Sequence, residues 1–488
     1  MPAVSTKPRV VVVGGSFAGL CTARHLKTTC DVVVVEPRDY FEYTPGALHL
    51  MAGSDAYSAL LSPMSQVARG CRHEQGWFLG IRSGVRRAVV RARKENGDEE
   101  IRELDFDALV LCNGVAYPSP IRASASAGSL EERVKELNDQ KLTFETSDNI
   151  FIVGGGLVGV ELAAELAVRL RHKPKITLMS RGALLNTLPA RAGVIAQSWL
   201  KSHGVNLLIG EEVKEHSKES RVVRTKGGLE IPADLLMDCT GVGPRPGVST
   251  PNLGRVRSGG GAGEEDVVWP YSDDGLVRVD ESLEALQFQK AGVFAAGDVV
   301  EHCGGGGVGF ASSTEKAPWG TKSTRPTVRN AHLAESQAEL CAANVRRFIA
   351  ARDAARVVGG SGGDDINAML PLVSPVAYLR YPQDAFYGAP LNPLLSCVSL
   401  GPRHAIVCFN GVVIGGGLLG VLGMMAAVAK FIIERTKISE ARQQPFGRAF
   451  WALGHVAVNT IHAGWAMLWT RPRTWLMERR RGAARPAF

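Results

Sequence analysis

The stretch Arg9-Val-Val-Val-Val13, followed by Gly14-Gly15-Ser16-Phe17-Ala18-Gly19, decides the fold of this chain of 488 residues. A continuous β-branched run is typical of a strand buried on both faces of a parallel sheet. After the glycine turn we expect a helix from Leu20 to Leu26 and then a second strand, Asp31-Val-Val-Val-Val-Glu36. This order of elements predicts an open α/β sheet.

The glycine turn predicts a dinucleotide-binding site. Gly14 permits the tight turn and Gly19 lets the helix pack closely on the strand. Ser16 stands where a second glycine normally lets the backbone approach a pyrophosphate, and serine is small enough to be tolerated there. Glu36 follows Gly14 by 22 residues and is placed to accept hydrogen bonds from a ribose. The alternative is a plain tight turn between strand and helix.

The same pattern returns at residue 149. Asn149-Ile-Phe-Ile-Val153 leads into Gly154-Gly155-Gly156-Leu157-Val158-Gly159, a complete G-x-G-x-x-G, and then into a helix and the strand 175–179. Each half later carries Asp, four residues, Cys, one residue and Gly, which ends at Gly114 in the first half and at Gly241 in the second. Both glycines are expected at the carboxyl ends of parallel strands, where open α/β sheets bind ligands. Two such halves predict two bound nucleotides.

Charge and cysteine usage exclude several classes of protein. The net charge is +8, but seven arginines against one acid, Glu478, follow Phe446, so the excess is a local basic tail and a nucleic-acid partner is not favoured. The nine cysteines include no Cys-x-x-Cys pair, so neither a redox dithiol nor a metal site is predicted. Their scatter fits reduced thiols in an intracellular protein, and we expect no secretory signal ahead of the first strand.

A third motif carries a family resemblance. Gly292-Val-Phe-Ala-Ala-Gly297-Asp298 follows the two repeats, and in this order the chain resembles the flavoprotein reductases with two dinucleotide-binding domains. The segment Glu36-Pro-Arg-Asp-Tyr-Phe-Glu-Tyr-Thr-Pro45 resembles type II NADH:quinone oxidoreductases and their relatives similar to apoptosis-inducing factor and ferroptosis suppressor proteins. The resemblance covers about residues 8 to 350. The missing dithiol argues against the disulfide reductases of this superfamily.

The resemblance implies an α/β fold with two Rossmann-like domains and two cofactors. FAD is expected in a discontinuous domain, residues 1–120 and 275–370, and NADH or NADPH in residues 121–274. Asp298 matches the aspartate that bonds the FAD ribityl chain. The predicted cofactor contacts are Gly14, Gly15, Ser16, Gly19, Glu36, Arg38, Asn113, Gly114, Gly154, Gly156, Gly159, Ser180, Arg181, Gly241 and Asp298.

Two residues are candidates for catalysis. Glu161, on the first turn of the second glycine-rich helix, matches a glutamate that approaches the nicotinamide and the flavin; the alternative is a solvated glutamate favoured by the helix dipole. His332 stands where the quinone reductases carry a glutamine near the flavin, and it is able to hydrogen-bond a quinone or supply a proton. The alternative is a histidine that only contacts the flavin edge. After the strand 175–179 the chain supplies Ser180 and Arg181 and no acid, which favours the use of NADPH, or at least tolerance of it. The alternative is that Arg181 only stacks on the adenine or points to solvent.

The C-terminal region, residues 371–488, is predicted to be an α+β segment at a membrane surface. Residues 405–414 indicate a hairpin around Asn410-Gly411, with a helix from about 418 to 437. The uncharged residues 449–470 place His455, Asn459 and His462 on one helix face, beside a cluster of tryptophans and arginines. This favours a helix lying in the membrane interface. The alternative is a homodimer interface or packing on the domain body.

The sequence therefore predicts a peripheral-membrane NAD(P)H:quinone oxidoreductase that does not pump protons, in the cytosol or the mitochondrion. Two alternatives stay open: a reductase of a soluble electron-transfer protein or another small acceptor, and a protein similar to apoptosis-inducing factor in which FAD is structural and the surface binds partners.

Overall fold

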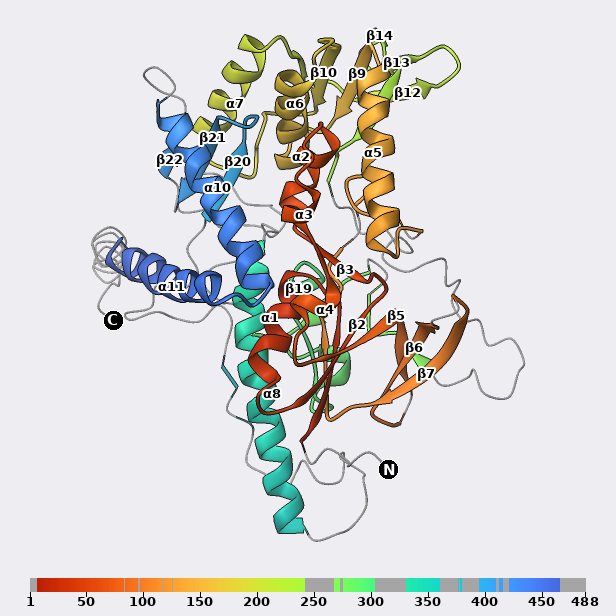
Figure 1. Cartoon of the computed structure of the whole chain (residues 1–488), viewed down its shortest axis with the longest axis vertical. Coiled ribbons are helices and arrows are strands. Elements are labelled where there is room, and N and C mark those ends of the chain that lie inside the picture. Colours follow the sequence, from red (N-terminus) through yellow and green to blue (C-terminus); the bar gives the residue numbers. More distant parts are fainter. Residues whose placement is uncertain are drawn as a thin grey trace, which may run out of the picture.

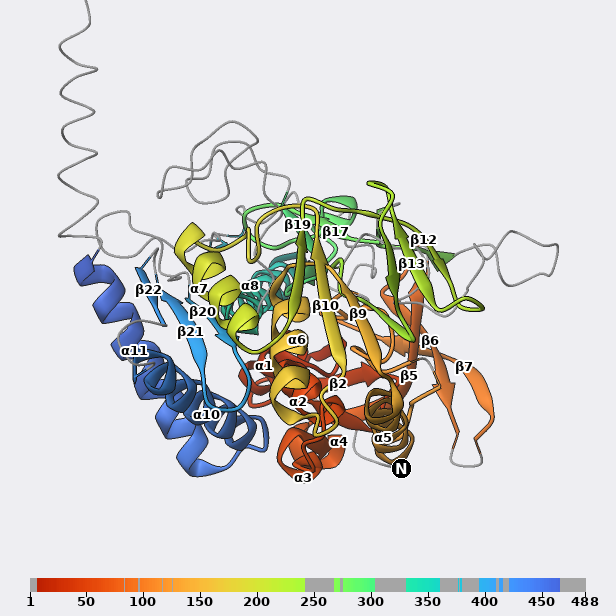
Figure 2. The ribbon, with the colours of Figure 1, turned by 90° about the horizontal axis from the view of Figure 1, so that it is seen from above.

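The computed structural model describes most of the chain (Figure 1). The described residues are 7–241 except 83, 95–96, 116 and 125, then 267–302 except 273–274, 331–359, 376, 378–379, 395–415 except 410–411, and 421–465. Figures 1 and 2 show two sheets, one above the other in Figure 1, with helices packed on each.

The first sheet is built around the opening motif. Its strands run in the order β18 (Val293–Ala295), β8 (Ala108–Leu111), β1 (Arg9–Val13), β2 (Asp31–Glu36), β5 (Arg72–Arg82), β6 (Arg87–Arg93) and β7 (Glu99–Asp105). The first four strands pair in parallel, as the sequence predicted for β1, β2 and β8 but not for β18. Helix α1 (Phe17–Leu26) begins three residues before the expected Leu20, because Ser16 is already the extended residue that precedes the helix.

The antiparallel part of this sheet was not predicted. β5 pairs with β6, β6 pairs with β7, and β16 (Val267–Val268) adds to β5 from a distant part of the chain. The long helix α8 (Ala331–Gly359) packs on α1 and covers the sheet, as Figure 1 shows. Two short parallel strands, β17 (Val277–Val279) and β19 (Val300–His302), flank β18.

The second sheet repeats the parallel pattern. Its order is β11 (Asn206–Ile209), β10 (Lys175–Ser180), β9 (Asn149–Val153) and β15 (Leu235–Asp238), and all neighbours are parallel. Helices α5 (Leu130–Thr146), α6 (Leu157–Arg169) and α7 (Ala190–Ser202) pack around it (Figure 2). A small antiparallel sheet, β12 (Val213–Ser217), β13 (Val222–Thr225) and β14 (Glu230–Pro232), lies at its end.

Short elements after β2 bring the two halves together. These are β3 (Tyr40–Glu42), η1 (Thr44–Gly46), α2 (Ala47–Met51), α3 (Tyr57–Leu60), β4 (Leu61–Pro63) and α4 (Met64–Val67). Their apolar side chains share one core with α6, β9 and β10 of the second half. The C-terminal strands contribute Val398 and Ile406 to the same core.

The C-terminal segment forms a three-stranded antiparallel sheet and two helices. β20 (Leu395–Ser399), β21 (Ala405–Phe409) and β22 (Val412–Ile414) pair in order, which confirms the predicted hairpin. Helix α10 spans Val421–Ala441, a little later than predicted. Helix α11 begins at Pro445, four residues before the expected 449, because proline suits the first turn of a helix.

Helix α10 connects the two halves. In its middle Lys430 contacts α6, and near its end Lys437 contacts Glu335 of α8 at 2.5 Å. No helix in the described part of the chain is long and apolar enough to span a membrane. Residues 466–488, and the side chains of His455, Asn459 and His462 within α11, lie outside what the structure describes.

Candidate active site at the carboxyl ends of two parallel sheets

The first cradle lies along one edge of the first sheet. Because β18, β8, β1 and β2 are parallel neighbours, their carboxyl ends meet at the same edge. Asp298, Gly114, Gly14 and Glu36 follow or end these strands in that order. Asp298 and Glu36, the first and last of these residues, are separated by three interstrand spacings, or about 14 Å. The predicted FAD contacts are therefore spread along a line, as an extended dinucleotide requires.

The turn after β1 leaves room only for glycine. Gly14 has φ +106°, and a Cβ there would lie 2.5 Å from the carbonyl oxygen of Cys112. A Cβ on Gly19 would overlap the carbonyl oxygen of Gly14. A Cβ on Gly15 would lie 2.9 Å from Cγ of Glu36. The helix start and the two strand ends are thus in direct backbone contact, which is the geometry that opens a helix N-terminus to a phosphate.

Glu36 closes this cradle at the end of β2. Its carboxylate accepts the Gly15 backbone N–H at 2.7 Å and the Arg38 Nε–H at 2.6 Å. Burial alone would raise the pKa of Glu36, but Arg38 and the Gly15 N–H lower it, so the group stays ionised. A buried carboxylate beside a phosphate-binding turn suits a ribose that donates hydroxyl hydrogens.

The opposite end of the line is built from Asn113 and the turn around Asp298. Asn113 Oδ1 accepts the Tyr271 hydroxyl at 2.8 Å. The backbone N–H of Gly297 donates to Gln337 Oε1 of α8 at 2.7 Å. Gln337 was not among the predicted residues; it fixes the turn that carries Asp298.

Arg122 is a second residue that the sequence did not reveal. One of its guanidinium nitrogens lies 4.0 Å from the place of a Cβ on Gly114. Burial, followed by the nearby Arg38, lowers the pKa of Arg122. Among the described residues we find no hydrogen bond or ion pair of this guanidinium. A buried guanidinium beside a phosphate-binding turn fits a bound pyrophosphate.

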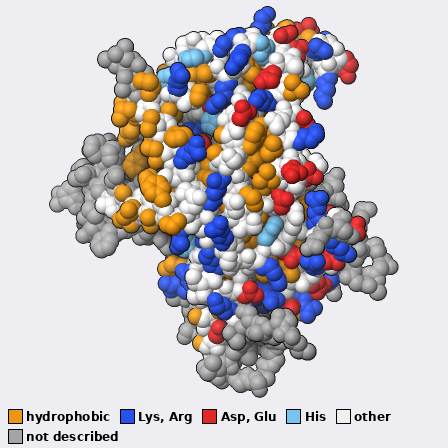
Figure 3. All heavy atoms as spheres, in the orientation of Figure 1, with side chains coloured by type: hydrophobic (Ala, Val, Ile, Leu, Met, Phe, Trp, Pro, Cys, Tyr) orange, Lys and Arg blue, Asp and Glu red, His pale blue; other side chains and the backbone are white. Residues whose placement is uncertain are grey.

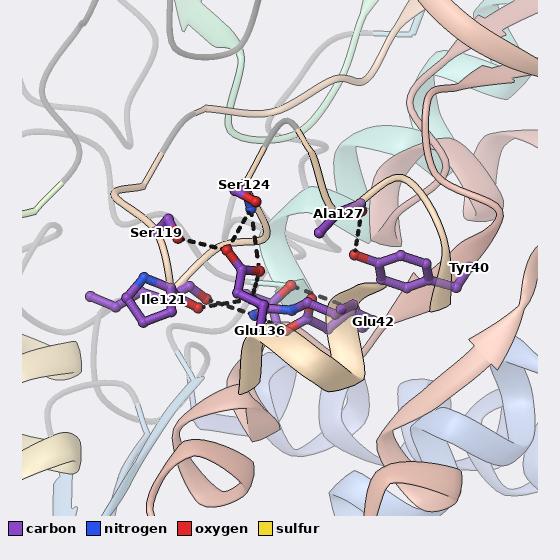
Figure 4. Close-up of polar contacts among 10 residues, drawn as sticks. Tyr40, Glu42, Ser119, Ile121, Ser124, Ala127 and Glu136 are labelled. Carbon is purple, nitrogen blue, oxygen red and sulfur yellow. Dashed lines mark hydrogen bonds and ion pairs between the residues drawn. The ribbon is translucent and has the colours of Figure 1, made fainter. Parts of the chain in front are cut away.

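A buried ion pair holds the loop that carries Arg122. Arg133 of α5 bonds both carboxylate oxygens of Glu42, at 2.8 and 3.0 Å, and also bonds Glu136 at 2.6 Å and the Pro120 carbonyl at 3.0 Å. Figure 4 shows Glu136 also reaching Ser119 and Ser124 of this loop. The loop is therefore tied at several points, which fixes the approach of Arg122 to the cradle.

The second sheet builds a second cradle. Gly154 has φ +114°, and a Cβ on it would lie 2.5 Å from the carbonyl carbon of Cys239. A Cβ on Gly159 would overlap the Gly154 carbonyl oxygen, whereas one on Gly156 would meet nothing within 4 Å. Gly241, at φ +100°, follows β15. The open space at Gly156, the first residue before α6, is where a second pyrophosphate fits.

Ser180 and Arg181 end β10 in different environments. Ser180 is buried against the turn at Gly155. The Arg181 side chain is 80% exposed and lies 3.6 Å from Glu212, which also pairs with Lys226. Ser180 corresponds to Glu36 of the first half. Each residue ends the strand that pairs with the strand leading into the glycine motif, β10 beside β9 and β2 beside β1. No carboxylate ends β10, and a cation stands beside it.

Glu161 does not lie free in the cradle. Its Oε1 accepts the Ser399 backbone N–H at 2.6 Å and lies 3.0 Å from Lys430 Nζ. One turn on, Glu165 is fully buried and contacts His49 Nδ1 at 2.9 Å and Arg169 Nε at 2.6 Å. Burial would raise the pKa of Glu165, but His49 and Arg169 bring it down to about 2. No motif in the sequence indicates Lys430.

The remaining predicted residue, His332, lies in the first turn of α8, on the helix that also carries Gln337. The described residues hold no cluster of three or more His, Cys, Asp or Glu side chains suited to a metal ion.

Comparison with known proteins gives this geometry a family. Residues 8–338 match the model of the pyridine nucleotide-disulphide oxidoreductases. The chain belongs to this family. The match includes both glycine motifs and the Gly297-Asp298 turn. Membership confirms the class predicted from the sequence, a nicotinamide-nucleotide oxidoreductase with FAD and NADH or NADPH as cofactors. The two cradles described above fit that pair.

Relatives of this oxidoreductase are similar over part of their length. Ferroptosis suppressor protein 1 of Taeniopygia guttata is 31% identical over 244 residues, which are 48% of this chain and 62% of the relative. Demethylphylloquinone reductase NdbB of Synechocystis is 25% identical over 324 residues, 60% of this chain and 72% of the relative. The sulfide:quinone oxidoreductase of Aquifex aeolicus shares the fold, with a TM-score of 0.58 at 16% identity over 89% of this chain and 92% of that chain.

Proposed function

We propose that the protein is an FAD-dependent NAD(P)H:quinone oxidoreductase. The observation that carries this proposal is the pair of parallel-sheet cradles in a chain without a Cys-x-x-Cys pair. The names of two similar proteins, demethylphylloquinone reductase and sulfide:quinone oxidoreductase, support a quinone as the acceptor.

The residues of the site have separable roles. Bound FAD supplies the group that accepts a hydride from the nicotinamide nucleotide and passes two electrons to the acceptor. The Gly14 turn and Arg122 bind the FAD pyrophosphate, Glu36 the adenosine ribose and Asp298 the ribityl chain. Gly154, Gly156 and Gly159 seat the nicotinamide nucleotide, with Glu161 near its ring. His332 stands on the acceptor side.

The nucleotide is proposed to be NADPH, or NADPH as well as NADH. An acid at the end of β10 would repel the 2′-phosphate of NADPH, and the strand ends in Ser180 instead. Arg181 is exposed and close to the motif, so it is able to turn from Glu212 to a phosphate.

A membrane surface is the proposed partner of α10 and α11. Apolar side chains gather on this face, as Figure 3 shows in orange over the two helices. The most exposed are Met425 at 62%, Val428 at 59%, Phe431 at 56%, Phe446 at 71%, Leu453 at 72% and Val456 at 65%. Such a patch suits an interfacial helix that rests on lipid, from which a lipophilic quinone would arrive. A second copy of the chain is the competing occupant.

Turnover with a short-chain, water-soluble quinone tests the proposed activity. The full-length protein with FAD should oxidise NADPH or NADH only when the quinone is added, with kcat in the usual range of about 1–1000 per second. FAD that stays bound but transfers no electrons to any quinone would favour a structural flavin. Reduction of a ferredoxin without quinone turnover would favour a soluble acceptor.

A further inference from the structure

Lys430 lies at the carboxylate that the proposed function places beside the nicotinamide. Its Nζ is 3.0 Å from Glu161 Oε1, and both side chains are 13% exposed. The second partner of Glu161 is the Ser399 backbone N–H. Both partners come from the C-terminal segment, more than 230 residues away in the chain. The C-terminal segment therefore completes the environment of a residue in the nucleotide-binding half.

Lys430 is the first charged residue of α10, and its side chain is turned inward. Its neighbours Val428 and Phe431 are exposed on α10. Burial alone would lower the pKa of Lys430, but the Glu161 carboxylate raises it, so the ammonium stays charged. A buried ion pair contributes little to stability compared with apolar packing, so stability alone does not explain it.

The two carboxylates of α6 have separate cations. Glu165 is paired by His49 and Arg169, whereas Glu161 is the ion-pair partner of Lys430 among the described residues. Lys430 thus contacts the carboxylate nearest the start of α6, while Glu165 acts on it only at longer range. Oxidation converts a neutral dihydronicotinamide ring into a cation, and a carboxylate without a partner near the ring would bind the oxidised form more tightly.

We propose that Lys430 is a positioning residue that balances the charge of Glu161, so that the site does not hold the oxidised nucleotide too tightly. The proposal rests on the proposed function for the place of the nicotinamide ring. It gives the C-terminal segment a role in nucleotide exchange in addition to any role at a membrane.

The test compares two nucleotides that differ in ring charge. We would titrate the FAD-loaded, full-length protein at about pH 8 with NADP⁺ and with 1,4,5,6-tetrahydro-NADP, whose ring is uncharged and transfers no hydride. The readout is the ratio of the two Kd values, from calorimetry or the flavin spectrum. Lys430→Met should shift the ratio about tenfold in favour of NADP⁺, equivalent to about 1.4 kcal/mol.

Variants of Glu161 should shift the ratio of the two Kd values in the opposite direction, and in combination with Lys430→Met they should cancel its effect. Glu161→Gln leaves the lysine uncompensated, so it should shift the ratio about tenfold against NADP⁺. The double variant Glu161→Gln with Lys430→Met should return near the wild-type ratio, and Lys430→Arg should keep it. Glu161→Gln keeps the size of the side chain, so it tests the proposal even if Lys430→Met does not fold.

Arg169→Met is the matched control. It removes a cation from the same helix, eight residues beyond Glu161, or about 12 Å along the axis. Its ratio should equal that of the wild type. Equal ratios in the wild type, Lys430→Met and Glu161→Gln would overturn the proposal. A wild-type protein that binds neither nucleotide would instead overturn the proposed function.

Discussion

Substituting one glycine in each motif should remove one cofactor and spare the other. A Cβ on Gly19 would overlap the carbonyl oxygen of Gly14, and a Cβ on Gly159 would overlap that of Gly154. Because real Cβ contacts stay beyond 3.0 Å, each Ala variant must move the helix start from the turn by more than about 1 Å. Close-packed backbone cannot absorb this by rotating a side chain.

The magnitude follows from the hydrogen bonds that the displaced helix start offers. A phosphate at a helix N-terminus accepts backbone N–H groups, each worth about 1.5–3 kcal/mol when the acceptor is charged. Loss of one or two such bonds predicts a fall in affinity of about tenfold or more. Overpacking adds about 1–3 kcal/mol of destabilisation to the half that carries the substitution.

Two assays separate the halves. Gly19→Ala should lose FAD on gel filtration, read as the ratio of absorbance at 450 to 280 nm. Gly159→Ala should keep FAD but lose NADP⁺ binding. Gly454→Ala is the control, because Gly454 lies on α11, outside both motifs, and a Cβ there meets only Trp451, at 4.0 Å; this variant should keep both cofactors. If Gly159→Ala lost FAD and kept NADP⁺, the assignment of the two cradles would be refuted.

Three further predictions concern charge and surface. Burial raises the pKa of Glu284 to about 7, so between about pH 4.5 and 7 the folded state holds a proton that the unfolded state has released, and stability falls as the pH rises. Relative to the wild type, the free energy of unfolding of Glu284→Gln, measured with urea, should therefore be higher at pH 8 than at pH 4 by up to about 3 kcal/mol. An equal difference between variant and wild type at both pH values would contradict this. Arg181→Glu should move the ratio of kcat/KM for NADPH over NADH about tenfold toward NADH, and an unchanged ratio would place Arg181 outside the pocket. Phe431→Glu with Leu453→Glu should lower flotation with anionic liposomes at least tenfold, whereas Val194→Glu, at a site 66% exposed on α7, should not; no flotation of the wild type would favour a contact between copies.

Much of the scaffold was predictable because its signals are local. The valine runs of β1 and β2, the glycines beside them and the acid at residue 36 lie within 28 residues, so period and turn chemistry identify them. The repeat at residue 149 and the hairpin near residue 410 were predicted for the same reason. The exact helix starts were not, because they depend on which residue caps the first turn.

The residues that complete the site were not predictable, because their contacts are distant in the chain. Arg122 sits in a loop fixed by Arg133 and Glu42, and neither has a motif of its own. Lys430 is one of several charged residues on α10, and no motif distinguishes it before the fold brings it to Glu161. The antiparallel strands β5 to β7 read as ordinary alternating segments, and their position beside β2 follows only from tertiary pairing.

An anaerobic titration of the purified protein tests the central claim most directly. NADPH or NADH should bleach the flavin band near 450 nm with one equivalent of nucleotide per flavin, and one equivalent of a water-soluble quinone should restore it fully. A flavin that reduced nucleotide does not bleach, or that bleaches and is not reoxidised by quinone, would contradict the account.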